Sequence, residues 1–175
     1  IKINGEKIKK EAELNDHEEA FETLVKELEA NNVVESLDEI KGIGHRIVQG
    51  GDYFDRTVVI DKDVLSKIEE LSDLAPLHNP AAVTGIKAAK DVFPNAVQTA
   101  VFDTAFHQTM PKENFLYALP ISWYTDLKVR RYGAHGTSHK FVSERMNEIL
   151  GRTDTKLITC HIGNGASISA VVNGK

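Results

Sequence analysis

Two apolar segments that read as buried strands, at 43–48 and 96–103, constrain the fold of this 175-residue chain more than any other feature. Gly50-Gly51 follows the first segment closely and Asp103 ends the second, while helix-like segments lie between them. Strands that alternate with helices form parallel sheets, and such sheets bind ligands at the carboxyl ends of their strands. The sequence therefore predicts an α/β fold with Arg46 and Asp103 near strand ends that could bind a ligand.

The other elements follow from hydrophobic periodicity, capping residues and turn residues. These signals predict a hairpin over 1–10, a helix from Asn15 or Asp16 to Asn31, a strand over 57–61, helices over 63–73 and 80–90, an extended Leu77–Asn79, a helix over 139–150 capped by Thr137 or Ser138 and closed by Gly151, and strands over 157–161 and 167–172. The βα rhythm gives way to an aromatic-rich region around 104–120. We therefore expect one domain over 1–105 and the beginning of a second over 106–175.

Both ends of the chain look cut. It begins without an initiator Met, and it ends at Asn173-Gly174, a hairpin-turn signal with no return strand after it. We therefore expect this chain to be a piece of a longer protein.

Composition excludes several classes of function. Hydrophobic residues at 41% and charged residues at 27% are ordinary values for a globular protein. The net charge of −5 at pH 7 argues against a nucleic-acid partner, and no apolar run reaches membrane-spanning length. A lone cysteine, Cys160, leaves no internal disulfide and fits a reducing compartment. These features predict a cytoplasmic protein without a nucleic-acid or membrane partner.

Candidate chemistry concentrates in Arg130–His139, where two arginines lead into His135 between small residues and a Thr-Ser pair opens a helix. Fixed positive charge and a titratable ring at a helix N-terminus suit an oxyanion or a phosphoryl group, although a buried histidine in a tight turn has the same pattern. Further stretches of this character are 44–51, 75–80, 101–107 and 160–167. In the last of them, Gly163-Asn164-Gly165 exposes backbone N–H groups as phosphate loops do, but it is not a Walker loop.

Two other classes remain open from the residues alone. His135 and His139, at i and i+4, could bind zinc with His161 as the third ligand of a metal hydrolase. Against this, Gly136 stands where the general base Glu is expected. A binding or scaffold module without nucleotide is the third class. The number of motifs that carry candidate catalytic or ligand-binding residues disfavours it.

Together, these motifs resemble the acetate kinase family, part of the acetate and sugar kinase/Hsp70/actin superfamily. The match in identity, order and spacing covers 42–175, whereas 1–41 carries no motif that can be assigned. The resemblance implies reversible phosphoryl transfer between ATP and acetate, with Mg²⁺, giving acetyl phosphate and ADP. It implies an α/β fold of that superfamily, with most of the first domain and the start of the second.

The resemblance also implies a role for each matching residue. Arg46 would bind the carboxylate and the migrating phosphoryl group, Asp103 would be the catalytic acidic residue near the metal, and His135 would stabilise the transition state. The other implied site residues are His78 at the phosphoryl group, Val48, Leu77 and Ala134 at the methyl pocket, and His161, Ile162, Gly163, Asn164 and Gly165 at the nucleotide phosphates. Because a carboxylic acid is already ionised at pH 7, Asp103 is expected to hold Mg²⁺ or its waters rather than act as a base.

The sequence departs from the family at two positions. Gln49 replaces a frequent histidine, and Ala134 replaces the usual phenylalanine before His135. The second change raises the alternative of a slightly longer substrate acid such as propionate. The family's N-terminal phosphate loop, second active-site arginine, adenosine site and metal-binding Glu have no counterpart here, so we expect the isolated chain to be inactive and the full-length protein to be a homodimer.

Overall fold

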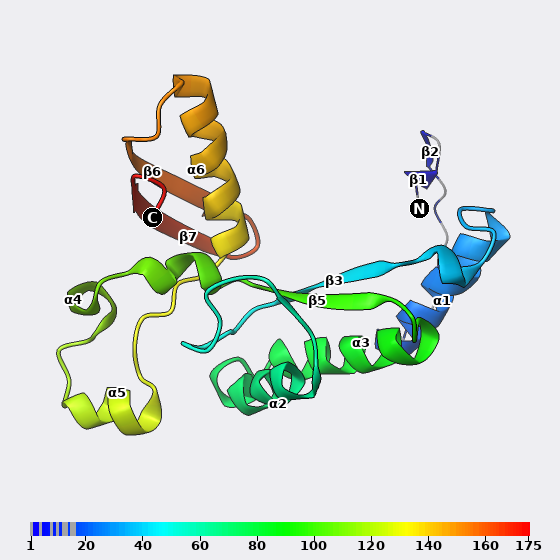
Figure 1. Ribbon diagram of the computed structural model, residues 1–175, viewed down its shortest axis with the longest axis horizontal. Helices are drawn as coiled ribbons and strands as arrows, with labels where there is room; N and C mark the ends of the chain where they lie inside the picture. Colours follow the sequence, from blue (N-terminus) through cyan, green and yellow to red (C-terminus); the bar gives the residue numbers. More distant parts are fainter. Residues whose placement is uncertain (1, 4, 8, 10, 12–13, 15–16) are drawn as a thin grey trace.

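The computed structural model describes residues 2–3, 5–7, 9, 11, 14 and 17–175 (Figure 1). Its helices are α1 (His17–Ala30), α2 (Lys62–Glu70), α3 (Asn79–Val92), α4 (Lys112–Phe115), α5 (Ile121–Leu127) and α6 (Gly136–Leu150). Its strands are β1 (Lys2–Ile3), β2 (Glu6–Lys7), β3 (Gly42–Ile47), β4 (Val58–Val59), β5 (Val97–Phe102), β6 (Lys156–Ile162) and β7 (Ala166–Val172). Short 3₁₀ helices, η1 (Leu37–Glu39), η2 (Leu71–Leu74) and η3 (Ala105–Thr109), complete the elements.

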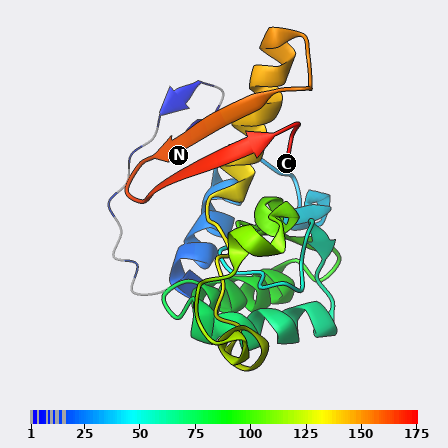
Figure 2. The same cartoon turned by 90° about the vertical axis from the view of Figure 1, so that its left-hand side faces the viewer.

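A three-stranded sheet in the order β3-β5-β4 forms the first half of the fold. β3 runs parallel to β5, with Ile47 opposite Phe102, so both strands end at the same edge. α2 and α3 lie along one side of these strands (Figures 1 and 2). The core lies between these helices and the strands. Its buried apolar residues are Ile47, Phe54, Val64, Ile68, Val83, Ile86, Ala100 and Phe102. This packing fixes the strand ends, and therefore the residues that follow them.

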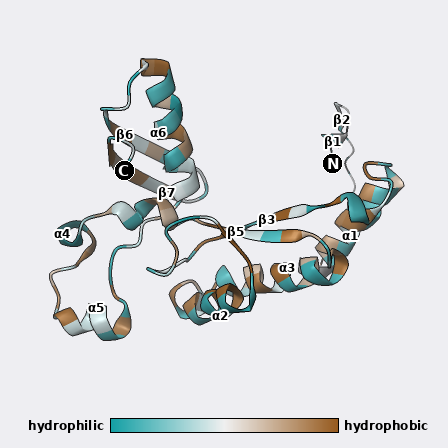
Figure 3. Ribbon diagram, in the orientation of Figure 1, coloured by the Kyte–Doolittle hydropathy of each residue, from teal (hydrophilic) through white to brown (hydrophobic). Residues whose placement is uncertain are grey.

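The second half consists of α6 and the antiparallel hairpin β6–β7, which α6 contacts on one face (Figure 1). Figure 3 shows hydrophobic positions on both strands of the hairpin. Val171 is buried, but Ile158, Ile162 and Ile168 on the hairpin are exposed. The chain reaches this half through η3, α4 and α5, where Arg130 lies over the ring of Phe115 at 3.7 Å from its centroid.

Most predicted elements are present with shifted ends, and the predicted α/β class is confirmed. The hairpin expected over 1–10 pairs β1 with β2 antiparallel in its described part, and the cap expected at Asn15 or Asp16 lies outside the described residues. The strand predicted over 57–61 shortens to β4, and the helix over 63–73 is α2 followed by η2. Gly151 closes α6 in the left-handed conformation, as expected, with φ 64°.

Three local predictions were wrong. The segment 77–79 is not extended, because the backbone N–H groups of His78 and Asn79 both donate to Ala75 O at 3.0 Å, and α3 begins at Asn79. The helix predicted over 139–150 begins earlier, at Gly136. Its N-cap is His135, rather than the Thr137 or Ser138 that the sequence predicted. The strand at 43–48 was expected to be buried, but β3 is an edge strand of its sheet and alternates between exposed and half-buried residues before Ile47.

Among the helices of the described residues, none combines the length and the apolar character that crossing a membrane would require.

Candidate active site

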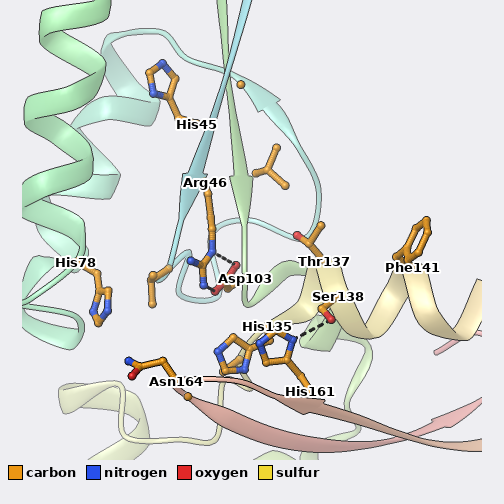
Figure 4. Close-up of a pocket in the computed structure, with 15 residues that line it drawn as sticks. His45, Arg46, His78, Asp103, His135, Thr137, Ser138, Phe141, His161 and Asn164 are labelled. Carbon is orange, nitrogen blue, oxygen red and sulfur yellow. Dashed lines mark hydrogen bonds and ion pairs between the residues drawn. The ribbon is translucent and has the colours of Figure 1, made fainter. Parts of the chain in front are cut away.

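A cleft of about 1040 Å³ lies where the two halves meet, at the carboxyl ends of β3 and β5 and beneath the start of α6 (Figure 4). Side chains from both halves contribute to it. The lining residues are Gly44, His45, Arg46, Val48, His78, Val101, Asp103, Ala134, His135, Thr137, Ser138, Phe141, His161, Asn164 and Gly165.

An ion pair between Arg46 and Asp103 forms the sheet-side wall of this cleft. The guanidinium Nε donates to Asp103 Oδ1 at 3.1 Å, and Nη2 donates to Oδ2 at 2.7 Å. Parallel pairing of β3 with β5 brings the residues together, since Asp103 N also donates to Ile47 O at 2.9 Å. The Asp103 side chain is 4% exposed, whereas that of Arg46 is 65% exposed, so the carboxylate orients a guanidinium that reaches solvent. The hydrogen bond and the charge of Asp103 raise the pKa of Arg46 above its usual value.

His135 stands opposite this pair, in a backbone conformation that its neighbours enforce. Its φ of 53° is left-handed, which is unusual for a residue with a side chain. His107 Nε2 lies 2.9 Å from Ala134 O, and Gly136 N donates to Asp103 O at 2.8 Å. Gly136 must be glycine here, because a Cβ would overlap the Asp103 carbonyl oxygen. The turn is therefore tied on both sides of His135 to the segment that follows β5.

The ring of His135 stacks on that of His161 from β6, with centroids 4.0 Å apart and planes at 18° (Figure 4). His161 Nδ1 is 2.9 Å from Ser138 Oγ, in the first turn of α6. Burial lowers the pKa of His135 below its usual value, and the neighbouring His161 adds to this effect. His135 is therefore biased toward its neutral form near pH 7.

His139, one turn further along α6, is buried and bonded on both ring nitrogens. Nδ1 lies 2.7 Å from Thr159 Oγ1, and Nε2 lies 2.8 Å from Ser167 Oγ. The same Ser167 hydroxyl lies 2.8 Å from His135 Nδ1. Burial lowers the pKa of His139 as well, so this ring is also biased toward its neutral form.

Most residues singled out in the sequence line this one cleft. Arg46, Val48, His78, Asp103, Ala134, His135, His161, Asn164 and Gly165 all do so. Leu77 lies instead in an adjoining groove of about 440 Å³, which it shares with Val48 and His78. Ile162 and Gly163 are outside the lining, and Ile162 alternates with His161 along β6 and is 79% exposed.

Sequence reasoning assigned no site role to several residues that the cleft contains. Thr137 and Ser138 were expected to cap α6, but they line the cleft, and the Ser138 hydroxyl contacts the His161 ring. Phe141 lies one turn after Thr137 on the same side of α6. The sequence signal that could have identified Thr137, Ser138 and Phe141 was their short distance after His135 in the chain. Ser167 stands in the 160–167 stretch, but nothing local predicts its contacts with two histidines.

The zinc arrangement considered for His135, His139 and His161 is not formed. Both ring nitrogens of His139 face hydroxyl groups, and the rings of His135 and His161 stack instead of converging on a point. Within 17–175 and the described residues before it, no group of three or more His, Cys, Asp or Glu side chains could hold a metal ion.

What the cleft offers is a set of groups for an anion. An oriented guanidinium, imidazole rings and the N-terminus of α6 surround it, and a helix N-terminus favours negative charge. Gly165 lies beside His135, since a Cβ there would be in ordinary contact with the ring Nε2, at 3.5 Å. These features define an α/β protein in which a cleft between two structural halves carries groups suited to an anion.

Comparison with known proteins specifies this class further. The chain matches the model of the acetokinase family over residues 1–175, and it belongs to that family. It is 56% identical over 177 residues to acetate kinase 2 of Listeria monocytogenes serotype 4b (strain F2365), covering 100% of the chain and 45% of that protein. It is 57% identical to the acetate kinase of Bacillus mycoides (strain KBAB4), again over 100% of the chain and 45% of the relative.

Solved structures give the same picture. The acetate kinase of Porphyromonas gingivalis superimposes with a TM-score of 0.90 at 47% identity, over 99% of this chain and 45% of that one. A propionate kinase from Francisella tularensis subsp. tularensis SCHU S4 superimposes with a TM-score of 0.86 at 48% identity, over 91% of this chain and 41% of that one. The chain thus spans less than half of the length of these relatives.

Proposed function

We propose that this chain forms the acid-binding side and part of the nucleotide-binding side of an enzyme that transfers a phosphoryl group reversibly between ATP and the carboxylate of acetate. The observation that carries the proposal is the meeting of Arg46 from the sheet half with His135 and His161 from the other half across one cleft. Membership of the acetokinase family supports it.

The proposed reaction needs positioning and charge neutralisation rather than a base. A carboxylate with a pKa near 4 is already ionised at pH 7. One of its oxygens forms the new bond to the γ-phosphorus of ATP, and the bond from that phosphorus to the β-phosphate oxygen breaks, releasing ADP. Negative charge spreads over the oxygens of the moving group, so donors placed around the cleft accelerate the reaction.

We assign the donors by their place in the cleft. Arg46 uses Nε and Nη2 to bind Asp103, which leaves Nη1 without a partner among the described residues and free for the acid or the phosphoryl group. His135 donates from the opposite wall, and His78, at the N-terminus of α3, lies beside the phosphoryl group. Val48 and Ala134 lie beside the methyl group of the acid, with Leu77 next to them in the adjoining groove, and the segment His161–Gly165 approaches the nucleotide phosphates.

Mg²⁺ enters the proposal as the ion that accompanies ATP. Asp103 is the carboxylate in the cleft lining, and both of its oxygens accept hydrogen bonds from Arg46. The described residues therefore fit an indirect role, in which Asp103 would hold the ion through its waters, since Mg²⁺ commonly keeps several of them, and the ion would neutralise charge on the nucleotide phosphates. The contribution that follows from its geometry is the orientation of Arg46.

Three further features of the intact protein belong to this proposal. A boundary near 105–106 divides the sheet half from the start of the nucleotide domain, because η3 begins there. The full-length protein forms a homodimer, as the family resemblance implies. It acts in the cytoplasm, where its co-substrate ATP is made and where the free Cys160 of this chain stays reduced.

Replacing Arg46 or His135 by alanine in the natural full-length protein tests the assignment. Each change removes a contact that tightens as charge develops, so kcat should fall by roughly 10²–10³-fold, or about 2.7–4 kcal/mol, while KM for ATP changes little. Acetyl phosphate trapped as its hydroxamate gives the rate. Arg56→Ala is the matched control, because Arg56 pairs with Asp55 on the surface. Near-normal kcat in both site variants would refute the assignment.

Propionate is a second candidate substrate, favoured by the methyl side chain of Ala134 in the cleft lining and by the structural similarity to a propionate kinase. A small residue there leaves room for one more carbon, and burying a methylene is worth about 0.8 kcal/mol. We expect kcat/KM for propionate within about tenfold of that for acetate, and a restored preference for acetate in Ala134→Phe. An unchanged ratio in that variant would show that Ala134 does not set the size of the pocket.

A further inference from the structure

A chain of hydrogen bonds runs from the interior of the second half to the cleft. Thr159 Oγ1 lies 2.7 Å from His139 Nδ1, His139 Nε2 lies 2.8 Å from Ser167 Oγ, and Ser167 Oγ lies 2.8 Å from His135 Nδ1. His139 and Thr159 are 2% and 5% exposed, so water does not compete for the inner bonds. The proposed reaction assigns no task to Thr159, His139 or Ser167.

The rings of His135 and His139 are the partners of Ser167 Oγ among the described residues, so its single proton goes to one of them and the hydrogen bonds can run in two directions. A hydroxyl group has one proton to donate, and a neutral imidazole has one N–H and one acceptor nitrogen. If Thr159 donates to His139, then His139 donates to Ser167 and Ser167 donates to His135 Nδ1. In the opposite direction every bond reverses, and His135 itself donates to Ser167. The proton of Thr159 therefore decides which nitrogen of His135 carries hydrogen.

The distances select the first direction. The other acceptor within reach of Thr159 Oγ1 is Ser169 O at 3.5 Å, at the limit of a hydrogen bond, whereas His139 Nδ1 is at 2.7 Å. The short contact is therefore the one in which Thr159 donates to the ring.

We propose that Thr159, His139 and Ser167 act as positioning residues that hold His135 as its Nε2–H tautomer, so that the neutral ring presents an N–H donor to the cleft. Nδ1 is occupied by Ser167, and Nε2 has no hydrogen-bond partner among the described residues. Gly165, a lining residue of the cleft, leaves space beside Nε2, because a Cβ on it would lie 3.5 Å from that atom.

The consequence for catalysis rests on the proposed function. A neutral ring in the other tautomer would direct a lone pair at the negative oxygens of the phosphoryl group and would repel them. In the Nε2–H tautomer, the same neutral ring donates a hydrogen bond to them without first taking up a proton. The burial that keeps His135 neutral is therefore compatible with a donor role.

The tautomer can be read directly from ¹⁵N spectra of the natural full-length protein labelled at histidine. His135 is assigned by the loss of its signals in His135→Gln. We expect a protonated Nε2 and an unprotonated Nδ1 at a pH where the ring is neutral. In Ser167→Ala, the two nitrogens should move toward the averaged shifts of a ring that samples both tautomers, and Ser167→Thr should restore the wild-type pattern. Ser169→Ala, on the same strand, is the control and should leave the pattern unchanged.

Kinetics provide the second measurement. Ser167→Ala should lower kcat by roughly 10–100-fold, as losses of such supporting partners commonly do, with KM for ATP and acetate within about twofold. Ser167→Thr should recover most of the rate. A wild-type spectrum with the proton on Nδ1 overturns the proposal, and this result needs no variant to fold. A protein with the expected tautomer but no kinase activity would overturn the proposed function and leave the tautomer assignment standing.

Discussion

The sheet half and the hairpin half hold their cleft residues in different ways. In the first, buried apolar side chains such as Phe102 and Ile47 fix the strand ends directly before Asp103 and beside Arg46. In the second, the buried contacts are largely polar. His139 meets two hydroxyl groups, and Thr155 Oγ1 donates to Asn147 Oδ1 at 2.6 Å.

An active site needs both the placement of its residues and the control of their protons, and the two halves supply these separately. Apolar packing is strong and places a strand end firmly, but it does not specify where protons lie. A buried network of hydrogen bonds specifies orientation and tautomer, and it depends on every partner being present. Arg46 carries a fixed charge and needs only placement. His135 has two possible donor nitrogens, so it needs the second kind of support.

The largest effect should come from the apolar core. Phe102 is 2% exposed and stacks on Phe54 with centroids 4.2 Å apart, so Phe102→Ala removes a buried ring and leaves a cavity. We expect the free energy of unfolding to fall by about 3–5 kcal/mol in denaturant titrations.

Phe141 offers the same substitution in the other half. It is 68% exposed on α6, so Phe141→Ala should change the free energy of unfolding by no more than about 0.5 kcal/mol. Similar losses for the two variants would contradict the distinction between an apolar sheet half and a polar hairpin half.

The turn that joins the halves should give an intermediate effect. Gly133 has φ 81°, and a Cβ on it would overlap the ring of His107, the residue that contacts Ala134 O. Gly133→Ala combines backbone strain with a displaced His107, so we expect a loss of about 1–3 kcal/mol in stability together with a reduced kcat.

Gly151 separates these two causes. It also has a positive φ, of 64°, but a Cβ there meets nothing within 4 Å. Gly151→Ala should therefore destabilise α6 without changing kcat. If Gly133→Ala lowered stability but left kcat untouched, the position of His135 would not depend on His107.

Sequence patterns predicted what local rules control. Hydrophobic periodicity located β3, β5 and α3, and the parallel pairing of strands brings Arg46 and Asp103 to one edge. The patterns failed where contacts between distant residues decide the conformation. His135 is the N-cap of α6 because the residues on either side of it are held in place: Ala134 O contacts His107 Nε2, and Gly136 N donates to Asp103 O.

The same reasoning explains the other misses. Asn79 precedes a proline, which disfavours helix, yet it begins α3 because its buried side chain bonds to the backbone of Gln49 at 3.0 and 3.1 Å. Ser167 gave no local signal, because its partners lie 28 and 32 residues away in the chain. Contacts of this kind depend on the assembled fold and not on any one segment.

The smallest effect should come from the outer face of the hairpin. Ile158 is 76% exposed, so Ile158→Thr exchanges an apolar group that is already in water and retains the branched shape that strands favour. We expect a change of no more than about 0.5 kcal/mol in the free energy of unfolding of the 175-residue chain. Ile68→Thr is the comparison variant in the sheet half, where the side chain is 0% exposed, and exchanging a buried apolar group for a hydroxyl there should cost more than about 1 kcal/mol. Equal losses of stability at the two positions would mean that the face of the hairpin bearing Ile158 is covered in solution. The difference between an apolar sheet half and a polar hairpin half would then hold only for the packing within this chain.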